Sequence, residues 1–528
     1  MTQLLLLGDE ALAQGALDAG LSGCYAYPGT PSTEIMEYIQ ASREAAERGV
    51  HREWSCNEKV AMEESLGMSF AGKRAMVCMK HVGLNVAADG FVNSAVTGTH
   101  GGLLVVSADD PSMHSSQNEQ DSRFYAQFAM TPCLEPSNQQ EVYAMAAHGF
   151  ALSEQMETPV LVRLCTRLSH SRANVTVSAD KQPMKELDAL NEMRSRFVLL
   201  PAIAKRNYAR LCEKQDEFVR LSEESPFNSY SDGPDRSIGV IATGIGYNYL
   251  QEAFAGACPH PVLKISQYPL PKRQLARLLS ECQQIMVIEE GMPLVEQMLR
   301  GPLGDDGRTR GRLSGDLPRT GELNPRAVAQ AFGLPTPALP AASPLVKMRP
   351  PRLCDGCPHA NSYDALNEVL KNRPTSRIFG DIGCYTLGAL PPYNAIHSCV
   401  DMGASISMAK GAADAGVQPA VAVIGDSTFT HSGMTALLDA VWENSPITVI
   451  ILDNGTTGMT GGQTSQAAGR MENICAGLGV APEHIRILTP LPKHHADNVK
   501  ALTEELDYAG LSVVIFRREC IQTLRRKK

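Results

Sequence analysis

Short runs of apolar residues alternate with longer stretches of helical periodicity along almost the whole chain. Runs of this kind, apolar on both faces, are typical of strands buried in a parallel sheet. The clearest runs are AMVCMK (75–80), GLLVVSADD (102–110), TPVLVRLC (158–165), AVAVIG (420–425) and SPITVIILD (445–453). Because such strands alternate with helices, the pattern predicts an α/β protein built on parallel sheets.

The same pattern divides the chain into parts. At 528 residues the chain is too long for one hydrophobic core, and a prior of about 150 residues per domain predicts roughly three domains. We expect a first domain over residues 1–195 and a middle domain over residues 236–305. Residues 306–350 are rich in glycine, proline and charge, which predicts a linker that does not pack. A third domain would cover residues 351–528.

Composition and charge exclude several classes of protein. The chain is 43% hydrophobic and 20% charged, with a formal net charge of -9, so neither nucleic acid nor an anionic membrane is an expected partner. The start, MTQLLLLG, lacks the features of a signal peptide and predicts a buried strand that enters a helix. No stretch of about 18 apolar residues predicts a transmembrane helix. The fourteen cysteines are scattered, which favours reduced thiols and a cytoplasmic protein.

Polar residues follow two of the predicted strands in the last third of the chain. Asp426 follows AVAVIG and Asn454 follows ITVIILD, with 26 residues between Ser427 and Asn454, enough for one crossover helix. At the shared edge of the sheet, a carboxylate and an amide oxygen would suit Mg²⁺. The glycine-rich segment 455–462 would let backbone N–H groups approach a phosphate. Gly-Asp-Ser alone is also common turn chemistry, so the prediction depends on the whole arrangement.

This arrangement resembles the thiamine diphosphate signature of the transketolase and pyruvate oxidoreductase superfamily. The resemblance implies that Mg²⁺ is held by the side chains of Asp426 and Asn454 and by the carbonyl group of Thr456. It also implies that the residues around this ion bind the diphosphate group. These residues are Gly425, Asp426, Ser427, Asn454, Thr456, Gly458, Met459 and Thr460.

A thiamine enzyme of this superfamily also needs a glutamate that hydrogen-bonds the aminopyrimidine ring, so that the thiazolium carbon can lose its proton. The segment WSCNEKVAMEESLGMSFAG (54–72) supplies Glu58 as the candidate. Glu63 and Glu64 lie in the same segment and compete for this role. In the alternative interpretation, Glu58 is one of several carboxylates on a solvated helix face.

Two cysteines three positions apart open the last third of the chain, in RLCDGCPH (352–359). A C-x-x-C pair is compatible with half a zinc site, a thioredoxin-like redox pair, a disulfide, or half the ligands of an iron–sulfur cluster. The thioredoxin-like alternative is less favoured because no strand precedes the pair. Zinc and an iron–sulfur cluster stay open on spacing alone.

Four further motifs carry a resemblance to one family. YPGTPSTEI (27–35), NEKVAMEE (57–64), MKHVGLNVAADGF (79–91) and DDPSMHSSQNEQDSRFYA (109–126) together resemble the large subunit of indolepyruvate ferredoxin oxidoreductases. The resemblance implies oxidative decarboxylation of an arylpyruvate to an aryl-acetyl-CoA and CO₂, with single electrons passed to ferredoxin. It also implies a pyrimidine-binding domain, then a transketolase C-terminal-like domain, then a diphosphate-binding domain.

The resemblance also assigns site residues. Thr30 matches the hydroxyl that contacts the substrate carboxylate in this family, although a threonine in a PGTPS turn can equally cap that turn. Arg123 is expected to bind an anion, because it is charged at any relevant pH and can grip a carboxylate with two donors. The family motifs place further residues around the active site, namely His81, His114, Gln117 and Asn118.

For the cysteines, the resemblance implies a cluster. A C-x-x-C pair, a cysteine in a Gly-Cys turn and one after the last strand match Cys354, Cys357, Cys384 and Cys520. Four thiolates in loops of one domain suit a 4Fe-4S cluster, with zinc as the alternative. Cys399 and Cys475 are the spare candidates.

The partners follow from one departure from the family pattern. The printed sequence stops at LRRKK, before the ferredoxin-like domain with further clusters that the family usually carries. Those clusters would lie on another subunit, be removed, or be absent. We expect a smaller oxidoreductase subunit, ferredoxin or another electron carrier, coenzyme A as co-substrate, and a homodimer core. Two other functions stay open: a non-oxidative thiamine diphosphate-dependent decarboxylase or carboligase, and a non-catalytic scaffold.

Overall fold

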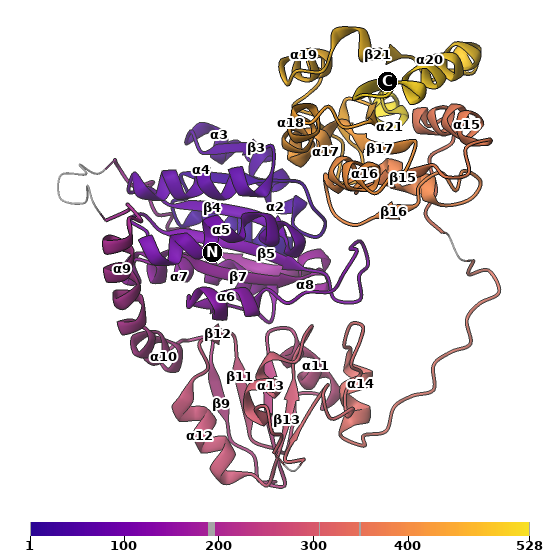
Figure 1. Ribbon diagram of the computed structural model, residues 1–528. Helices are drawn as coiled ribbons and strands as arrows, with labels where there is room; N and C mark the ends of the chain where they lie inside the picture. The colour runs from indigo at the N-terminus through magenta and orange to yellow at the C-terminus, as the bar shows by residue number, and fades with distance from the viewer. Residues whose placement is uncertain (1, 188–195, 306, 348–349, 527–528) are drawn as a thin grey trace. The chain divides into compact units, whose positions relative to one another are not determined.

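The computed structural model divides the chain into two compact units, Met1–Pro340 and Ala341–Lys528, which we call unit 1 and unit 2. The described residues are 2–187, 196–305, 307–347 and 350–526. The predicted domain limit at residue 195 and the start of the predicted linker at residue 306 lie outside them. Figure 1 shows sheets with surrounding helices in each unit.

The first sheet of unit 1 has seven strands. They are β2 (Gly23–Ala26), β3 (His51–Trp54), β4 (Ala75–Lys80), β5 (Leu103–Asp109), β6 (Cys133–Leu134), β7 (Val160–Cys165) and β12 (Gln267–Tyr268). Their order is β12-β6-β7-β5-β4-β2-β3, and all neighbours are parallel except β12 and β6. Every residue of β4, β5 and β7 is buried, which confirms the strands predicted from apolar runs.

Eight helices connect or flank these strands in the described part of the first 170 residues. They are α1 (Gly8–Asp18), α2 (Thr33–Ala41), α3 (Arg43–Glu47), α4 (Glu58–Phe70), α5 (His81–Thr97), α6 (Arg123–Ala129), α7 (Gln139–Met156) and α8 (Thr166–His170). Asparagine side chains fix two helix starts: Asn57 accepts from the backbone N–H of Val60 (2.8 Å) and Asn138 from that of Glu141 (2.9 Å). These caps satisfy N–H groups that have no partner within the helix.

The N-terminal strand differs from the prediction. β1 (Thr2–Leu7) pairs antiparallel with β8 (Arg172–Val177) in a sheet of two strands and leads into α1. The strand was predicted correctly, but its burial was not, because Leu5 is 59% exposed while Leu6 is buried. A two-stranded ribbon on the surface covers only one of its faces, so alternate residues stay in contact with solvent.

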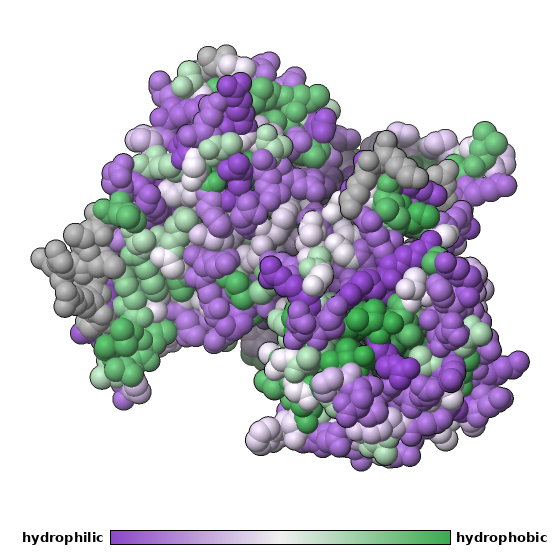
Figure 2. All heavy atoms as spheres, turned by 90° about the horizontal axis from the view of Figure 1, so that it is seen from above, coloured by the Kyte–Doolittle hydropathy of each residue, from purple (hydrophilic) through white to green (hydrophobic). Residues whose placement is uncertain are grey.

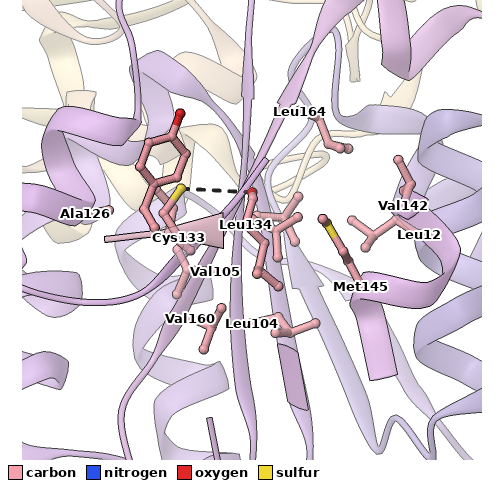
Figure 3. Packing of buried hydrophobic residues seen from close by; sticks show 14 of the residues in the cluster. Leu12, Leu104, Val105, Ala126, Cys133, Leu134, Val142, Met145, Val160 and Leu164 are labelled. Carbon is pink, nitrogen blue, oxygen red and sulfur yellow. Dashed lines mark hydrogen bonds between the residues drawn. The ribbon is translucent and has the colours of Figure 1, made fainter. Parts of the chain in front are cut away.

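The core of unit 1 is packed from strands and helices together. Figure 3 shows Leu104 of β5 and Val160 of β7 in one cluster with Leu12 of α1, and all three are fully buried. The dashed line marks the thiol of Cys133, which is 3.9 Å from the carbonyl oxygen of Leu134. A weak contact of this kind leaves Cys133 as a small hydrophobic residue of the core.

A second sheet of unit 1 has five strands in the order β14-β13-β10-β11-β9. The strands are β9 (Ser229–Ser231), β10 (Ile238–Thr243), β11 (Val262–Ile265), β13 (Gln284–Ile288) and β14 (Thr309–Arg310). Helices α9 (Pro201–Glu213) and α10 (Gln215–Glu223) precede it, and α11 (Gly246–Ala253), α12 (Lys272–Glu281), α13 (Leu294–Arg300) and α14 (Pro325–Ala331) accompany it. Only β9 is antiparallel to its neighbour.

The linker predicted over residues 306–350 is wrong for its first half. β14 pairs with β13, α14 contacts α11, and the side chains of Leu317, Leu323 and Val328 are buried. A two-residue strand and a seven-residue helix are too short to leave a periodic pattern among so many glycines and prolines. Residues 334–347 contain neither helix nor strand.

Buried ion pairs join the two sheets of unit 1. Arg163 on β7 pairs with Asp109 (2.6 Å) and Glu135 (2.5 Å), and it donates to the carbonyl oxygen of Glu290 (2.9 Å), which follows β13. Removing these charges from water is costly unless every one is matched. One hydrophobic cluster also runs through both sheets. The first and middle predicted domains therefore share one core.

Unit 2 contains a parallel six-stranded sheet in the order β16-β15-β17-β18-β22-β21. The strands are β15 (Arg377–Gly380), β16 (Ser398–Cys399), β17 (Ala420–Gly425), β18 (Ile447–Asp453), β21 (Ile485–Leu488) and β22 (Ser512–Arg517). β17 and β18 are buried throughout, as their apolar runs predicted.

Side chains of this sheet alternate between two cores. Ala422 and Ile424 of β17 face a cluster formed with α16 (Ala404–Asp414), α18 (Met434–Trp442) and α19 (Met471–Gly477). Val421 and Val423 face the cluster formed with α15 (Pro358–Leu370) and α20 (His495–Asp507). This alternation follows from the two-residue period of a strand. Helices thus cover both faces and leave the strand ends accessible to loops.

The surface is mostly polar. Figure 2 shows charged and polar residues over most of the face drawn, with smaller apolar patches between them. On α18, Trp442 is 87% exposed and Leu438 is 51% exposed. Within the described residues, no helix has both the length and the apolar character needed to cross a membrane.

Candidate cofactor and active site

Asp426 lies where β17 ends and is the first residue of the short helix α17 (Asp426–Thr428). Its side chain is 2% exposed, and its Oδ2 atom has no hydrogen-bond partner among the residues that the structure describes. Burial, with a further effect of the Asp453 carboxylate, raises the pKa of Asp426 to about 7. A buried carboxylate oxygen without a partner is unfavourable. The side chain is therefore suited to bind a cation.

Asn454 follows β18 at the same edge of the sheet and is also buried. Its Oδ1 atom accepts from the backbone N–H of Thr456 (3.0 Å), and its amide nitrogen lies 3.2 Å from Nε2 of His359. Burial lowers the pKa of His359 to about 4, so the neutral ring can accept this hydrogen bond. The two contacts fix the direction of the Asn454 amide. His359 was not predicted; its position two residues after Cys357 was the one available signal.

An aromatic ring covers the backbone at Gly425. A Cβ atom at Gly425 would lie 2.5 Å from Cε1 of Tyr385, so a larger residue does not fit there. The Tyr385 hydroxyl donates to Oδ1 of Asp381, and the Ser405 hydroxyl donates to Oδ2 (2.7 Å). Burial raises the pKa of Asp381 to about 8. Gly425 is thus required for close packing, and its predicted contact with diphosphate stays a prediction.

The segment after Asn454 forms a small hairpin of β19 (Thr456–Thr457) and β20 (Gln463–Thr464). Gly455 has a φ of 73°, a left-handed conformation that favours glycine. The hydroxyl groups of Ser427 and Thr457 share a hydrogen bond of 2.8 Å. This bond ties together the two segments that the sequence predicts around the diphosphate group.

The remaining predicted diphosphate residues, Gly458, Met459 and Thr460, follow Thr457 along the chain. A Cβ atom at Gly458 would lie 3.1 Å from the sulfur of Cys384. The side chain of Met459 is 56% exposed, and the hydroxyl of Thr460 donates to Oε1 of Gln463 (3.0 Å). The glycine-rich segment thus runs directly beside one of the predicted cluster cysteines.

The four predicted cluster cysteines all lie in unit 2, at turns or element ends. The N–H of Cys357 donates to the carbonyl oxygen of Cys354 (2.9 Å), Cys384 begins a 3-10 helix, and the N–H of Cys520 donates to the carbonyl oxygen of Asn454 (3.1 Å). Burial, with a smaller effect of the thiols of Cys357, Cys520 and Cys354, raises the pKa of Cys384 to about 12. The structure therefore brings the other three thiols within electrostatic range of Cys384.

Among the described residues, no three of these thiols lie within 4.8 Å of one another. In the described ranges, one group of three or more His, Cys, Asp or Glu residues has its ligand atoms within 4.8 Å of one another. This group lies in unit 1 and contains no cysteine. Zn–S bonds of about 2.3 Å would put tetrahedral sulfur atoms about 3.8 Å apart. Of the two spare candidates, Cys399 is exposed on β16, and Cys475 is buried in the core on α19.

In unit 1, Glu58 is the first residue of α4 and is 6% exposed. A Cβ atom at Gly83 of α5 would lie 2.6 Å from its Oε1 atom, so α5 can approach Glu58 only because residue 83 is glycine. The two competitors differ: Glu63 is exposed and pairs with Lys59, and Glu64 is exposed and accepts from Ser55 (2.5 Å). The competitors thus lie on the solvated part of the helix.

Lys80 is a further candidate that the sequence did not single out. It ends β4, is 8% exposed, and its Nζ atom donates to the carbonyl oxygen of Ser115 (2.7 Å). The Ser115 hydroxyl donates to the carbonyl oxygen of Thr30 (3.3 Å), which places Lys80 beside the PGTPS turn. Burial lowers the pKa of Lys80 to about 8. A lysine at the carboxyl end of a buried strand was the available signal.

The other predicted residues of the first domain differ in burial: His81 is buried and lies beside Asn118, whereas His114 and Gln117 are exposed. His81 is 1% exposed, its Nε2 atom lies 3.3 Å from the carbonyl oxygen of Asn118, and its Nδ1 atom has no hydrogen-bond partner in the described chain. The side chain of Asn118 also has a buried oxygen without such a partner there. His114 and Gln117 are exposed, and His114 lies 3.4 Å from Glu322.

Arg123 lies among groups of the protein, and its predicted anion-binding role stays a prediction. Its side chain is 1% exposed, and its guanidinium group pairs with Asp121 (2.6 Å) and Glu289 (3.0 Å). It also donates to the hydroxyl groups of Tyr268 (3.1 Å) and Thr243 (3.3 Å). Through these contacts Arg123 links the two sheets of unit 1.

Two protein families match the chain. The family "Pyruvate flavodoxin/ferredoxin oxidoreductase, thiamine diP-bdg" matches residues 14–219. The family "Thiamine pyrophosphate enzyme, C-terminal TPP binding domain" matches residues 381–502, which include Asp426 and Asn454.

Curated relatives match almost the whole chain. The chain is 38% identical to indolepyruvate oxidoreductase subunit IorA of Archaeoglobus fulgidus, over 98% of this chain and 86% of that protein. It is 37% identical to the subunit of the same name from Thermococcus kodakarensis, with the same coverage.

A solved structure shares the fold. The 2-oxoglutarate:ferredoxin oxidoreductase from Magnetococcus marinus, solved with 2-oxoglutarate, coenzyme A and succinyl-CoA bound, aligns with a TM-score of 0.50 at 18% identity. The alignment covers 63% of this chain and 65% of that chain.

Proposed function

This chain belongs to the indolepyruvate oxidoreductase subunit IorA family, and on that basis we propose that it converts an indolepyruvate-like 2-oxo acid to an aryl-acetyl-CoA and CO₂. It is the alpha-type subunit of a thiamine diphosphate-dependent enzyme of the 2-oxoacid:ferredoxin oxidoreductase family. The conversion releases two electrons for each 2-oxo acid, and ferredoxin takes them one at a time. Coenzyme A supplies the thiol that receives the acyl group.

The buried carboxylate of Asp426, whose Oδ2 atom has no hydrogen-bond partner among the described residues, is the observation that carries this proposal. Asp426, the Asn454 amide oxygen and the Thr456 carbonyl group would hold Mg²⁺ at the diphosphate group, a donor set that this hard cation prefers. Thiamine diphosphate supplies the carbon nucleophile and the electron sink when bound. Ser427, Gly458, Met459 and Thr460 would line the diphosphate group.

Glu58 is proposed to bind the aminopyrimidine ring. Because Glu58 is buried at the start of α4, its carboxylate is suited to a directed hydrogen bond with the ring. Glu63 and Glu64 are exposed, so their carboxylates are solvated. The role of Glu58 is to exchange a proton with the ring, so that the thiazolium carbon can be deprotonated.

Gly83→Ala is expected to lower kcat while leaving the fold intact. A methyl group there would lie 2.6 Å from Oε1 of Glu58 and must displace it, whereas alanine is otherwise favourable in a helix. We expect a loss of about tenfold or more, limited by the contribution of a general acid–base group, which is about 10²- to 10⁴-fold.

Gly90→Ala is the matched control for this change. It lies on the same helix, where the nearest atom to an added methyl group is Cγ of Met62 at 3.2 Å. Steady-state kinetics and thermal unfolding of both variants test the prediction. Equal kcat values for the two variants would show that Glu58 is not held by α5.

The substrate carboxylate is proposed to bind near the PGTPS turn. Thr30 offers a hydroxyl group, Lys80 a partly desolvated ammonium group, and His81 a buried ring nitrogen without a partner in the described residues. Lys80 joins Arg123 as a candidate cation in this proposal, and Arg123 also pairs with the protein carboxylates of Asp121 and Glu289.

Cys354, Cys357, Cys384 and Cys520 are proposed to hold a 4Fe-4S cluster. The thiols of Cys357, Cys520 and Cys354 act on the pKa of Cys384, which supports one shared site, and four thiolates in loops of one domain suit a 4Fe-4S cluster. Cys384 beside Gly458 and Cys520 bonded to Asn454 would bring the cluster close to the diphosphate site. Such closeness suits the transfer of single electrons.

Anaerobically prepared protein is therefore expected to contain about four iron atoms per chain, from the four-cysteine ligand set. Cys384→Ser should lose most of this iron and the oxidative reaction together. Cys475→Ser should keep both, because Cys475 is a core residue of α19. Iron and zinc analysis measures the outcome, and stoichiometric zinc without iron would contradict the cluster.

The finer architecture and the assembly are also proposals. We propose a pyrimidine-binding domain over residues 1–195, a transketolase C-terminal-like domain that begins at residue 236 and includes β14 and α14, and a diphosphate-binding domain over 351–528. A smaller oxidoreductase subunit and a homodimer core complete the assembly, and exposed Trp442 and Leu438 offer an apolar contact surface. The basic helix α21 (Ile521–Arg526), which follows Cys520, could attract an acidic ferredoxin.

Anaerobic reduction of a dye by several 2-oxo acids tests the function. Reduction that requires coenzyme A and is fastest with an arylpyruvate is the expected result, measured with the smaller subunit and an electron carrier present. Release of CO₂ without dye reduction would favour the non-oxidative decarboxylase or carboligase. No binding of thiamine diphosphate would favour the scaffold.

A further inference from the structure

Three potential metal ligands meet in unit 1 at the ends of three helices. Asp9 is the second residue of α1, Glu34 the second residue of α2, and His170 the last residue of α8. One ligand atom of each side chain lies within 4.8 Å of the other two. The cofactor site described above uses none of these residues.

Asp9 is the unusual member of this group. Its side chain is fully buried, and neither carboxylate oxygen has a hydrogen-bond partner among the described residues. Burial is the main reason why the pKa of Asp9 is raised to about 8; the nearby Ser169 hydroxyl opposes this rise and the Glu34 carboxylate adds to it. Leaving two buried oxygen atoms without partners is unfavourable whether the group is charged or neutral.

The other two side chains are partly matched. His170 lies 3.4 Å from Oε2 of Glu34, and each of these side chains is 34% exposed. The pair raises the pKa of His170 and lowers that of Glu34 through their mutual hydrogen bond. This pair satisfies the imidazole but leaves both oxygen atoms of Asp9 without a donor. A simple ion pair therefore does not account for the buried group.

We propose that Asp9, Glu34 and His170 form a binding site for a divalent first-row transition-metal cation. Two carboxylates and one imidazole suit Mn²⁺, Fe²⁺ or Zn²⁺, whereas Mg²⁺ prefers oxygen ligands alone. The exposed side formed by Glu34 and His170 gives the ion a path of entry and room for water ligands.

The geometry assigns this ion a structural role. α1 contacts both α2 and α8, and the three ligands come from these three helices, so one ion would fix all three together. Gly8, which precedes Asp9, allows that approach: a Cβ atom there would lie 2.2 Å from the carbonyl oxygen of Leu168 in α8. The inference does not depend on the proposed catalytic function.

Titration of the full chain with Mn²⁺ tests the site, with electron paramagnetic resonance measuring the free ion. Thiamine diphosphate is left out, so that the proposed magnesium site lacks its diphosphate ligand. We expect one bound Mn²⁺ per chain and a higher melting temperature with the metal. Asp9→Asn should weaken binding by at least about tenfold and abolish the thermal shift.

Two controls make the result specific. Asp18→Asn changes another buried carboxylate of α1, one that is bonded to Gln14 and Tyr143, and should bind Mn²⁺ as the wild type does. Asp426→Asn should also keep this binding. If Asp9→Asn does not fold, His170→Gln replaces it, because that side chain is partly exposed.

Three outcomes would overturn the proposal. In the first, no Mn²⁺ binds at about 1 mM free metal, the weak end of protein cation sites. In the second, the wild type, Asp9→Asn and His170→Gln bind Mn²⁺ equally. In the third, binding is lost in Asp426→Asn alone. Any of them would mean that water or a proton, not a metal, satisfies Asp9.

Discussion

Replacing Glu58 with glutamine is expected to lower kcat by about 10²- to 10⁴-fold, the usual contribution of a general acid–base group. Glutamine keeps the size of the side chain and a hydrogen-bonding oxygen, so thiamine diphosphate should still bind. It cannot exchange a proton with the aminopyrimidine ring. The effect should therefore fall on the chemical step and not on cofactor affinity.

Proton exchange at the thiazolium carbon, followed by nuclear magnetic resonance after transfer to heavy water, measures this step directly. Glu63→Gln and Glu64→Gln are the matched controls, because both side chains lie on the same helix and are exposed. They should exchange at the wild-type rate. Normal exchange in Glu58→Gln with slow exchange in either control would move the role to that residue.

Replacing Asp426 with asparagine is expected to weaken Mg²⁺-dependent binding of thiamine diphosphate by more than about 100-fold. That factor is the upper end for the loss of a supporting outer-shell partner, and Asp426 is proposed to touch the ion itself. Isothermal titration calorimetry with and without Mg²⁺ measures the change. Unchanged affinity would contradict the metal assignment.

The pKa of Asp426 gives this prediction a dependence on pH. Because the pKa of the folded protein, about 7, is above the ordinary value of about 3.9, the neutral carboxyl stabilises the fold at low pH and this stabilisation is lost as pH rises through 7. Mg²⁺ needs the ionised form, so cofactor affinity of the wild type should fall as pH decreases below about 7.

Asparagine resembles the neutral carboxyl at every pH. Without metal and cofactor, Asp426→Asn should therefore have a higher melting temperature than the wild type at pH 8, and the difference should shrink towards pH 5. A variant that is less stable at pH 8 would show that the carboxylate has a partner in the protein. The burial of the Asp426 carboxylate would then not be what destabilises the protein without its cofactor.

The sequence predicted the sheets well because strands buried on both faces leave unbroken apolar runs, as in β4, β5, β17 and β18. Elements too short to show a hydrophobic period were not predicted. β14 and α14 are such elements, and they lie in a segment that its composition alone predicted to be a linker. The exposure of Leu5 in β1 was not predicted for a different reason. An apolar run does not show how many strands will pair beside it, and β1 pairs with one strand in a sheet of two.

Among the site residues, those set by local sequence were predicted and those set by distant contacts were not. Asp426 and Asn454 follow their own strands, so their position at one edge of the sheet follows from the chain order. The pairing of Arg123 with Glu289 was not predicted, because Glu289 is far away in the sequence and charge alone does not identify a partner. Lys80 and His359 owe their altered pKa values to burial, which one sequence does not display.

The bond between Tyr268 and Glu135 spans 133 residues of chain, and β12 pairs with β6 across the same interval. During synthesis on a ribosome, the edge of the first sheet therefore stays open until the middle of the chain has emerged. Until then Arg123 and Arg163 lack the acceptors that Glu289 and Glu290 provide. Nascent chains of this protein should thus depend on chaperones for longer than the length of the first domain suggests, and a fragment ending near residue 230 should aggregate.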